Sequence, residues 1–241
     1  PTGIDRVDLA YAQWFAARPT LELVPVTRSA GGPLALPMAA FDIIRAELSR
    51  RWQADAPPGF GREDRSLVRY VAERAAGRLG RWRLLANARR PDAAGRPSVY
   101  LNVGQDGLDE PRNYAGLPGA KAALVHDVIP LTHPEYDTPR ATHLHAARVE
   151  ALARHFDFVI ANSEATRTDL LAAGPARVRF SAMTAHLGPA LAPPAAPMAF
   201  DAPTFVHVST INRRKNLSLL LHLWRDLAAQ PEVRARRAQE R

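Results

Sequence analysis

The 241-residue chain contains no cysteine. Disulfide bonds, thiolate catalysis and cysteine-ligated zinc or iron–sulfur sites are therefore excluded. Any catalytic chemistry must therefore use imidazole, carboxylate, hydroxyl or guanidinium groups. Lysine is also scarce, since Lys121 and Lys215 are the only two and the other 30 of the 32 cationic side chains are arginine. Against that background a lysine at position 215 is informative.

Long hydrophobic runs are missing as well. The sequence has no stretch of about 18 uninterrupted apolar residues and no charged-then-apolar leader, so nothing predicts a membrane span or secretion, and we expect a cytoplasmic protein. The hydrophobic content of 46% is that of a globular chain, and the net charge of +8 favours anionic partners. No DNA- or RNA-reading motif is present, so nucleic acid is not among the partners we expect.

Short β-branched runs alternate with longer helical patterns, which predicts an α/β fold with a parallel sheet. The predicted strands are Leu21–Val26, Val99–Val103, Ala122–Val125, Phe158–Ile160, Val178–Met183 and Phe205–Val208. The predicted helices are Asp5–Phe15, Ala40–Trp52, Ser66–Ala86, Pro139–Phe156, Ser163–Ala172 and Leu217–Ala229. Thr138 is the expected N-cap of the fourth helix, because Pro139 suits its first position.

The composition changes after Gly188, where five prolines lie between Pro189 and Pro203. Such a segment favours neither helix nor sheet and is typical of a linker. We therefore predict one domain over residues 1–188, a linker over 189–203, and the first βα unit of a second α/β domain over 204–241.

A basic turn, "STINRRKN", precedes the last predicted helix. Asn216 is a plausible N-cap, and Arg213, Arg214 and Lys215 then lie beside the positive end of the helix dipole, where backbone N–H groups are unpaired. This arrangement is suited to an anion, a diphosphate above all. The alternative is an ordinary solvated turn.

The stretch "ALVHDVIPLTHPEY" predicts a buried strand with His126 and Asp127 at its carboxyl end, where ligands bind in open α/β sheets. Asp127 could orient His126 or cap the segment that follows, and His126 could instead be a structural histidine. A metal site is not expected, because the neighbouring pair His143 and His145 faces different sides of a helix.

Two further stretches each lead into the start of a predicted helix. "PTGIDRV" places Gly3 in a turn before a helix, so that backbone could approach a ligand closely, with Arg6 one turn along. "FVIANSEATRTDL" is a strand that runs into Asn162 or Ser163 as the N-cap of the next helix. A purely structural βα junction explains the second stretch equally well.

In this order, "PTGIDRV", "LVHDVIPLTHPEY", "FVIANSEATRTDLL", "HLGPALAPP" and "VSTINRRKN" resemble family 4 (group 1) of the retaining glycosyltransferases, bacterial enzymes of mannosyltransferase-like type that act in polysaccharide biosynthesis. The resemblance covers essentially the whole chain. It implies the GT-B architecture, in which two Rossmann-like domains face across a cleft, the first holding the acceptor and the second the nucleotide-sugar donor. This chain would then hold the first Rossmann-like domain and the opening βα unit of the second.

The resemblance also implies roles for residues. Arg214, Lys215 and Asn216 would hold the donor diphosphate, and His126 with Asp127 would lie near the reacting centre. Gly3 and Arg6 would line the cleft loop. The implied reaction transfers a hexose, with mannose as one candidate, from a nucleotide diphosphate sugar to a glycan or lipid-linked acceptor with retention, without a metal or cofactor.

Some family features are missing. The first strand, which should precede Pro1, and most of the donor domain are absent, so we expect a fragment that is inactive alone. Ser209 stands where many relatives have glycine, and Asn212-Arg213 where they often have Glu-Pro.

Two alternatives remain. Sugar-nucleotide 2-epimerases use the same architecture. The chain could also be a non-catalytic module that binds anions or, through the arginine-rich range 62–85, the anionic inner face of the cell membrane.

Overall fold

A computed structural model describes residues 3–29, 32–53, 97–188 and 204–230. The chain divides into two compact units, Pro1–Ala190 and Leu191–Arg241. This division falls inside the range predicted as a linker, which lies outside the described residues.

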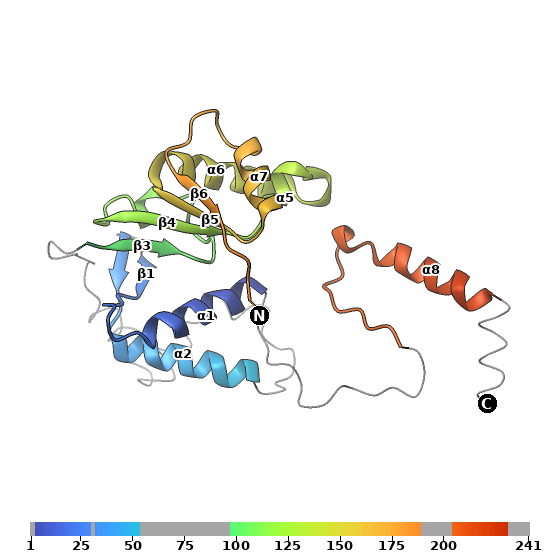
Figure 1. Cartoon of the computed structure of the whole chain (residues 1–241), viewed down its shortest axis with the longest axis horizontal. Helices are drawn as coiled ribbons and strands as arrows, with labels where there is room; N and C mark the ends of the chain where they lie inside the picture. The colour runs from blue at the N-terminus through green and yellow to red at the C-terminus, as the bar shows by residue number, and fades with distance from the viewer. Residues whose placement is uncertain (1–2, 30–31, 54–96, 189–203, 231–241) are drawn as a thin grey trace. The chain divides into compact units, whose positions relative to one another are not determined.

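The first unit contains most of the regular structure (Figure 1). Its longer elements are α1 (Gly3–Ala16), β1 (Val26–Ser29), β2 (Gly32–Ala35), α2 (Met38–Gln53), β3 (Val99–Asn102), β4 (Ala120–Val125), α6 (Pro139–His155), β5 (Phe158–Ala161), α7 (Glu164–Ala173) and β6 (Ser181–Thr184). Short helical turns lie between them: η3 (Pro111–Asn113), α5 (Ile129–Thr132) and η4 (Pro134–Tyr136).

The centre of this unit is a four-stranded sheet with the order β3-β4-β5-β6. Every neighbouring pair is parallel, with Ala123 opposite Val159 and Val159 opposite Ala182. Since each crossover steps in the same direction, right-handed connections place their helices on one face. Figure 1 shows α6 and α7 on that face and α1 on the opposite one. The described chain therefore has a mixed α/β fold with a parallel sheet.

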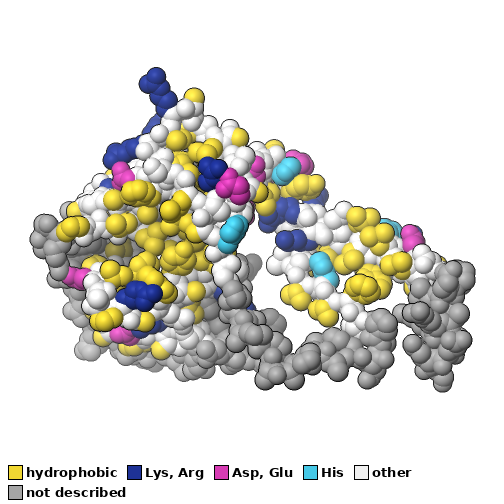
Figure 2. Space-filling view, in the orientation of Figure 1, with side chains coloured by type: hydrophobic (Ala, Val, Ile, Leu, Met, Phe, Trp, Pro, Cys, Tyr) yellow, Lys and Arg dark blue, Asp and Glu magenta, His cyan; other side chains and the backbone are white. Residues whose placement is uncertain are grey.

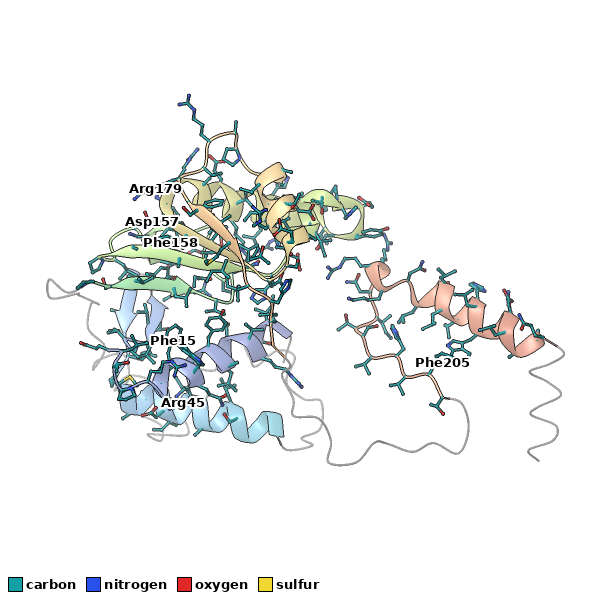
Figure 3. All side chains as sticks on the ribbon, in the orientation of Figure 1. Phe15, Arg45, Asp157, Phe158, Arg179 and Phe205 are labelled. Carbon is teal, nitrogen blue, oxygen red and sulfur yellow. The ribbon has the colours of Figure 1, made fainter. Side chains whose placement is uncertain are left out.

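The core lies between the sheet and α6. Phe156 and Tyr114 are both completely buried, and their ring centroids are 5.0 Å apart. The Tyr114 hydroxyl donates a hydrogen bond of 2.8 Å to the Leu108 carbonyl, which satisfies this buried polar group. At the amino end of β5, Arg179 Nη2 donates to Asp157 Oδ1 over 2.8 Å (Figure 3).

Side-chain caps begin the two helices on this face. Thr138 Oγ1 accepts from the Ala141 N–H at 3.2 Å, which confirms the predicted N-cap of α6. Ser163 Oγ accepts from the Thr166 N–H at 3.1 Å and caps α7. The sequence left Asn162 and Ser163 open as the N-cap of this helix, and the structure assigns the cap to Ser163.

Most predicted elements are confirmed, with shifts of a few residues. They are the strands at Val99–Val103, Ala122–Val125 and Phe158–Ile160 and the helices at Asp5–Phe15, Ala40–Trp52, Pro139–Phe156, Ser163–Ala172 and Leu217–Ala229. The strand predicted at Val178–Met183 begins only at Ser181, opposite Phe158, where its partner strand begins. The helix predicted at Ser66–Ala86 lies outside the described residues.

The strand predicted at Leu21–Val26 is wrong. Only Val26 belongs to a strand, the first of the antiparallel hairpin β1-β2, in which Val26 lies opposite Ala35. Leu21, Leu23 and Val24 suggest a strand, but residues 21–25 pair with no strand in the part of the chain that the structure describes, and Pro25 has no N–H to donate. Pairing, which sequence preference does not supply, decides where a strand begins.

The second unit contains η5 (Arg213–Lys215) and α8 (Leu217–Ala229). The strand predicted at Phe205–Val208 is wrong, since these residues have no strand partner within the described ranges. Phe205 instead packs edge-on against Trp224 of α8, with ring centroids 4.9 Å apart (Figure 3). Many hydrophobic side chains of this unit remain at the surface (Figure 2), and Val208 is 90% exposed.

Candidate functional site

The carboxyl ends of the four parallel strands meet at one edge of the sheet, which we call the carboxyl edge. The residues that follow β3, β4, β5 and β6 there are Val103–Gln105, His126–Asp127, Asn162–Ser163 and Ala185–His186. Open α/β sheets bind ligands at this edge. The predicted residues His126 and Asp127 therefore lie where a ligand would be expected.

His126 is only 8% exposed, and its Nε2 lies 2.8 Å from the Val103 carbonyl oxygen. A carbonyl oxygen can only accept, so Nε2 carries a proton and Nδ1 is the ring nitrogen left for another partner. This bond gives the buried ring a hydrogen-bond partner, as expected if His126 is a structural histidine. It also orients Nδ1, so the catalytic role of His126 stays a prediction.

Asp127 forms a turn just before α5. Its Oδ1 accepts from the Ile129 N–H at 3.2 Å, whereas the N-cap residue of α5 is Val128, which has no side-chain cap bond. None of the described hydrogen bonds joins Asp127 to His126. A direct catalytic role for Asp127 stays a prediction.

Thr166 joins two strand ends at this edge. Its Oγ1 is 3.0 Å from Asn162 Oδ1 and 3.4 Å from the His126 carbonyl oxygen. The side chain is buried, so these polar contacts are shielded from water. The first turn of α7 is thereby held against the residue that carries the candidate imidazole.

Glu164 lies in the first turn of α7 and contacts the β6 end of the carboxyl edge. Hydrogen bonds from Arg167 and then from Thr184 lower the pKa of Glu164 to about 2. The Thr184 Oγ1 bond is 2.8 Å long and connects α7 to the end of β6. Glu164 is therefore an anion at neutral pH and a link between two elements, not a general acid.

Asp8 is a feature that sequence reasoning missed. A Cβ atom at Gly104 would lie 2.5 Å from Asp8 Oδ2, so the carboxyl group of α1 lies directly against the turn after β3. The pKa of Asp8 is raised to about 6, first by partial burial and then by Asp5 and Asp106. The side chain keeps access to solvent on its open side. Such a group can exchange protons near neutral pH.

The glycine after β3 was the available signal for this contact, because a glycine at a strand end often marks a close approach. Asp106 in the same turn is paired, with Arg28 Nη2 at 3.7 Å and Arg148 Nη2 at 3.5 Å. The turn is therefore crowded with charge of both signs.

Gly3 and Arg6 lie in the first turn of α1, the helix that carries Asp8. A Cβ atom at Gly3 would meet nothing within 4 Å, so the space beside this residue is open. The Arg6 side chain is exposed and forms no ion pair with another described residue. Their helix reaches the carboxyl edge through Asp8, and their role in binding stays a prediction.

In the second unit, the basic turn is the 3-10 helix η5. Asn212 Oδ1 accepts from the Arg214 N–H at 2.9 Å, and Asn216 Oδ1 accepts from the Leu219 N–H at 3.3 Å, which confirms Asn216 as the N-cap of α8. Asn216 has a left-handed backbone with φ of 44°. Asparagine tolerates this conformation better than most residues, so the turn that precedes α8 depends on this residue type.

Arg213, Arg214 and Lys215 are all exposed, and none forms an ion pair with the described residues. The N–H groups of Leu217 and Ser218 likewise have no acceptor in that part of the chain. Three cations and two unpaired N–H groups of the first turn of α8 thus lie together, which is the composition of an anion site.

No group of three or more potential metal ligands occurs within the described ranges. Among the helices that the structure describes, none combines the length and hydrophobicity needed to cross a membrane. Comparison of the chain with models of known families, with curated proteins and with solved structures gives no match. What is established is a mixed α/β fold with a parallel sheet.

Proposed function

We propose that the chain is a retaining glycosyltransferase of the GT-B type, or part of one. It would transfer a hexose from a nucleotide diphosphate sugar to a glycan or lipid-linked acceptor. The observation that carries this proposal is the unpaired basic turn of Arg213, Arg214 and Lys215 at the start of α8. The parallel sheet and the histidine at its carboxyl edge support it.

The basic turn suits the leaving group of such a reaction. When the bond between sugar and diphosphate breaks, negative charge develops on the diphosphate oxygens. Arg214, Lys215 and the free N–H groups of α8 would stabilise that charge without reorganisation of solvent. Exposure of the turn leaves it accessible to a nucleotide.

His126 would serve the sugar or the acceptor in the first unit. Its Nε2 is engaged by the Val103 carbonyl, so Nδ1 is available to accept a hydrogen bond from a hydroxyl group. The ring is held by a buried contact, so positioning a hydroxyl group costs no further conformational entropy of the ring.

Nucleotide binding to the full 241-residue chain tests the proposal. Isothermal titration calorimetry with UDP and with GDP should show saturable binding, which Lys215→Ala and Arg214→Ala each weaken about tenfold, or ~1.4 kcal/mol. Arg225→Ala is the matched control, because Arg225 is an exposed arginine of α8, the helix that follows the basic turn, and lies beside Asp226. Equal affinities in all three variants would remove the basic turn from the binding site.

A transfer assay separates the activity from simple binding. Because we expect the chain to be inactive alone, the assay uses a longer protein that contains it. This protein is incubated with a panel of nucleotide sugars and oligosaccharide or lipid-linked acceptors, and the anomeric configuration of the product is read by NMR. A retained configuration supports the proposal, and an inverted one contradicts it. Isomerisation of the sugar nucleotide without acceptor would instead identify an epimerase.

A further inference from the structure

Asn162 is a polar residue of the carboxyl edge that has no assigned role, since Ser163 caps α7. It directly follows β5, and its N–H donates to the Val125 carbonyl oxygen over 3.2 Å. His126 follows β4 at the same level, because Val125 lies opposite Ala161. Neighbouring strands are about 4.8 Å apart. Asn162 and His126 are therefore adjacent residues at the place where open α/β sheets bind ligands.

Two hydroxyl groups at the start of α7 fix the orientation of the Asn162 amide. Ser163 Oγ donates to Thr166 Oγ1 over 3.0 Å, and Thr166 Oγ1 donates to Asn162 Oδ1 over 3.0 Å. Thr166 is only 8% exposed, so its hydroxyl group is shielded from water. Because Oδ1 and Nδ2 diverge from the same carbon atom, an amide held through Oδ1 keeps Nδ2 pointing away from Thr166. The side chain therefore presents its donor to a ligand.

Asn162 Nδ2 has no hydrogen-bond partner among the described residues. It is open to solvent, since the buried side-chain nitrogen atoms without a partner in these ranges belong to Arg45, Gln105 and Arg148. The same two properties hold for His126 Nδ1, although His126 as a whole is only 8% exposed. A donor and an acceptor, both unpaired and both accessible, thus lie at neighbouring strand ends.

Hydroxyl groups are the ligand chemistry that fits this pair. Asn162 Nδ2 can only donate and needs an acceptor oxygen, whereas Nδ1 of the neutral His126 ring can only accept and needs a donor. A hydroxyl group can act in either way, and carbohydrates carry hydroxyl groups on adjacent carbon atoms. A carboxylate would supply an acceptor for Nδ2 but no donor for Nδ1. The pair therefore favours a neutral polyol over an anion.

We propose that Asn162 is a further ligand-binding residue of the carboxyl edge. Its Nδ2 donates a hydrogen bond to one hydroxyl oxygen of a bound hexose, and another hydroxyl group of the same hexose donates to His126 Nδ1. This inference rests on the proposed function, because it takes the ligand of the first unit to be a sugar. Thr166 is a positioning residue, since it holds the Asn162 amide without contacting the ligand. An analogue that lacks the contacted hydroxyl group binds more weakly, because the amide is then left without an acceptor.

Solution NMR of the full chain, labelled with nitrogen-15, tests this contact directly. The probe is methyl α-D-mannopyranoside, with the methyl glycosides of glucose and galactose as further probes. The side-chain amide signals of Asn162 are assigned as the pair that disappears in Asn162→Ala. The expected result is saturable binding that shifts this pair of signals, because a hydrogen bond to the ligand changes the environment of Nδ2. Binding that leaves the pair unmoved overturns the proposal.

The affinity for the same probe gives a second readout. Asn162→Ala should weaken binding about fivefold, as expected for the loss of one neutral hydrogen bond. Gln13→Ala is the matched control, because Gln13 is an exposed glutamine whose amide donates to Ser49 Oγ. The affinity of this control should equal that of the unaltered chain. Equal affinities in the two alanine variants contradict the role given to Asn162.

Deoxy analogues of the probe separate a ligand contact from an effect on the fold. At one hydroxyl position, the monodeoxy glycoside should bind the unaltered chain about fivefold more weakly than the parent glycoside. In Asn162→Ala this difference should disappear, because the partner of the missing hydroxyl group is already gone. If the differences at all positions persist unchanged, Asn162 acts only through the fold and the proposal is overturned.

Thr166→Val provides a second variant if Asn162→Ala does not fold. Valine keeps the shape of threonine but lacks the hydroxyl group that orients the amide, so the affinity should fall several-fold, and Thr166→Ser should restore it. Equal affinities in both Thr166 variants contradict the positioning role. Failure of every glycoside to bind the unaltered chain overturns the inference, whereas nucleotide binding at the basic turn would still support the proposed function.

Discussion

The segment from Phe158 to Ala173 and the segment from Phe205 to Ala229 have the same sequence pattern: a short apolar run, a polar turn and an amphipathic helix. In the first unit the apolar run is β5, and Val159 and Ala161 are completely buried. In the second unit the corresponding run is not a strand, and Val206 is 67% exposed. Similar local sequences thus have different structural outcomes.

The helices do not show this difference. α7 and α8 both form, and each begins at a polar cap, Ser163 or Asn216. A helix satisfies its backbone within one segment, whereas a strand needs a neighbour for its N–H and C=O groups. β5 has β4 on one side and β6 on the other. The comparison teaches that neighbours, not apolar content, make the run at Phe158 a strand.

The largest expected effect concerns core packing, which differs between the two units. Phe156→Ala should lower the free energy of unfolding by about 3–5 kcal/mol, because it empties the centre of the aromatic cluster. Phe205→Ala, at a side chain that is 75% exposed, should change it by less than about 0.5 kcal/mol. Urea unfolding followed by circular dichroism measures both. Similar losses would contradict the difference in burial.

A backbone contact gives the next largest effect. Gly119 has φ of 80°, and a Cβ atom there would lie 2.1 Å from the Ser98 carbonyl oxygen, at the start of the β3–β4 pairing. Gly119→Ala should therefore cost about 2–3 kcal/mol of unfolding free energy. Gly116→Ala is the control, because a Cβ atom at Gly116 meets nothing within 4 Å. If both variants unfold at the same urea concentration, the close approach at Gly119 is wrong.

The two helix caps should differ in what they affect. Ser163→Ala should lower the unfolding free energy of the first unit by about 1 kcal/mol, because α7 loses its N-cap. Asn216→Ala should reduce the helical signal at 222 nm without moving the urea midpoint of the sheet. A midpoint shift of equal size in both variants would show that α8 contributes to the core of the first unit.

The smallest effect concerns pH. The pKa of Asp8 is raised to about 6 in the fold, above its ordinary value of 3.8. The folded chain therefore binds more protons than the unfolded chain between these values, and this carboxyl group lowers stability progressively as the pH rises from about 4 through 6. Asp8→Asn should raise the melting temperature at pH 7.5 and leave it nearly unchanged at pH 4.

The control for this pH effect is Asp169→Asn, at an exposed carboxylate of α7. Its melting temperature should differ from that of the unaltered chain by a similar small amount at both pH values. An equal pH dependence in the two variants would show that partial burial and the nearby Asp5 and Asp106 do not raise the pKa of Asp8.

Elements with strong local signals were predictable. Thr138 and Pro139 mark the start of α6, and Asn216 marks the start of α8, because caps act within one helical turn. The placement of His126 directly after a buried strand was also predictable from the apolar run before it. The roles of the residues at the predicted site remain predictions, since position alone does not assign chemistry.

Contacts between segments were not predictable. The hairpin of β1 and β2 was missed, because its pairing depends on a turn and a partner rather than on the apolar run at Leu21. The approach of Asp8 to Gly104 and the contact of Thr166 with the His126 carbonyl join residues that lie far apart in the chain. No local pattern encodes such a contact.

The sequence by itself determined which segments can be helical, where their caps lie, and which polar residues follow the buried strands. These properties depend on interactions between residues within about one helical turn of each other. Only the tertiary structure decided which apolar runs become strands, which ring nitrogen of His126 is free, and which carboxyl group has a raised pKa. Those outcomes depend on backbone partners and on burial, which long-range packing supplies.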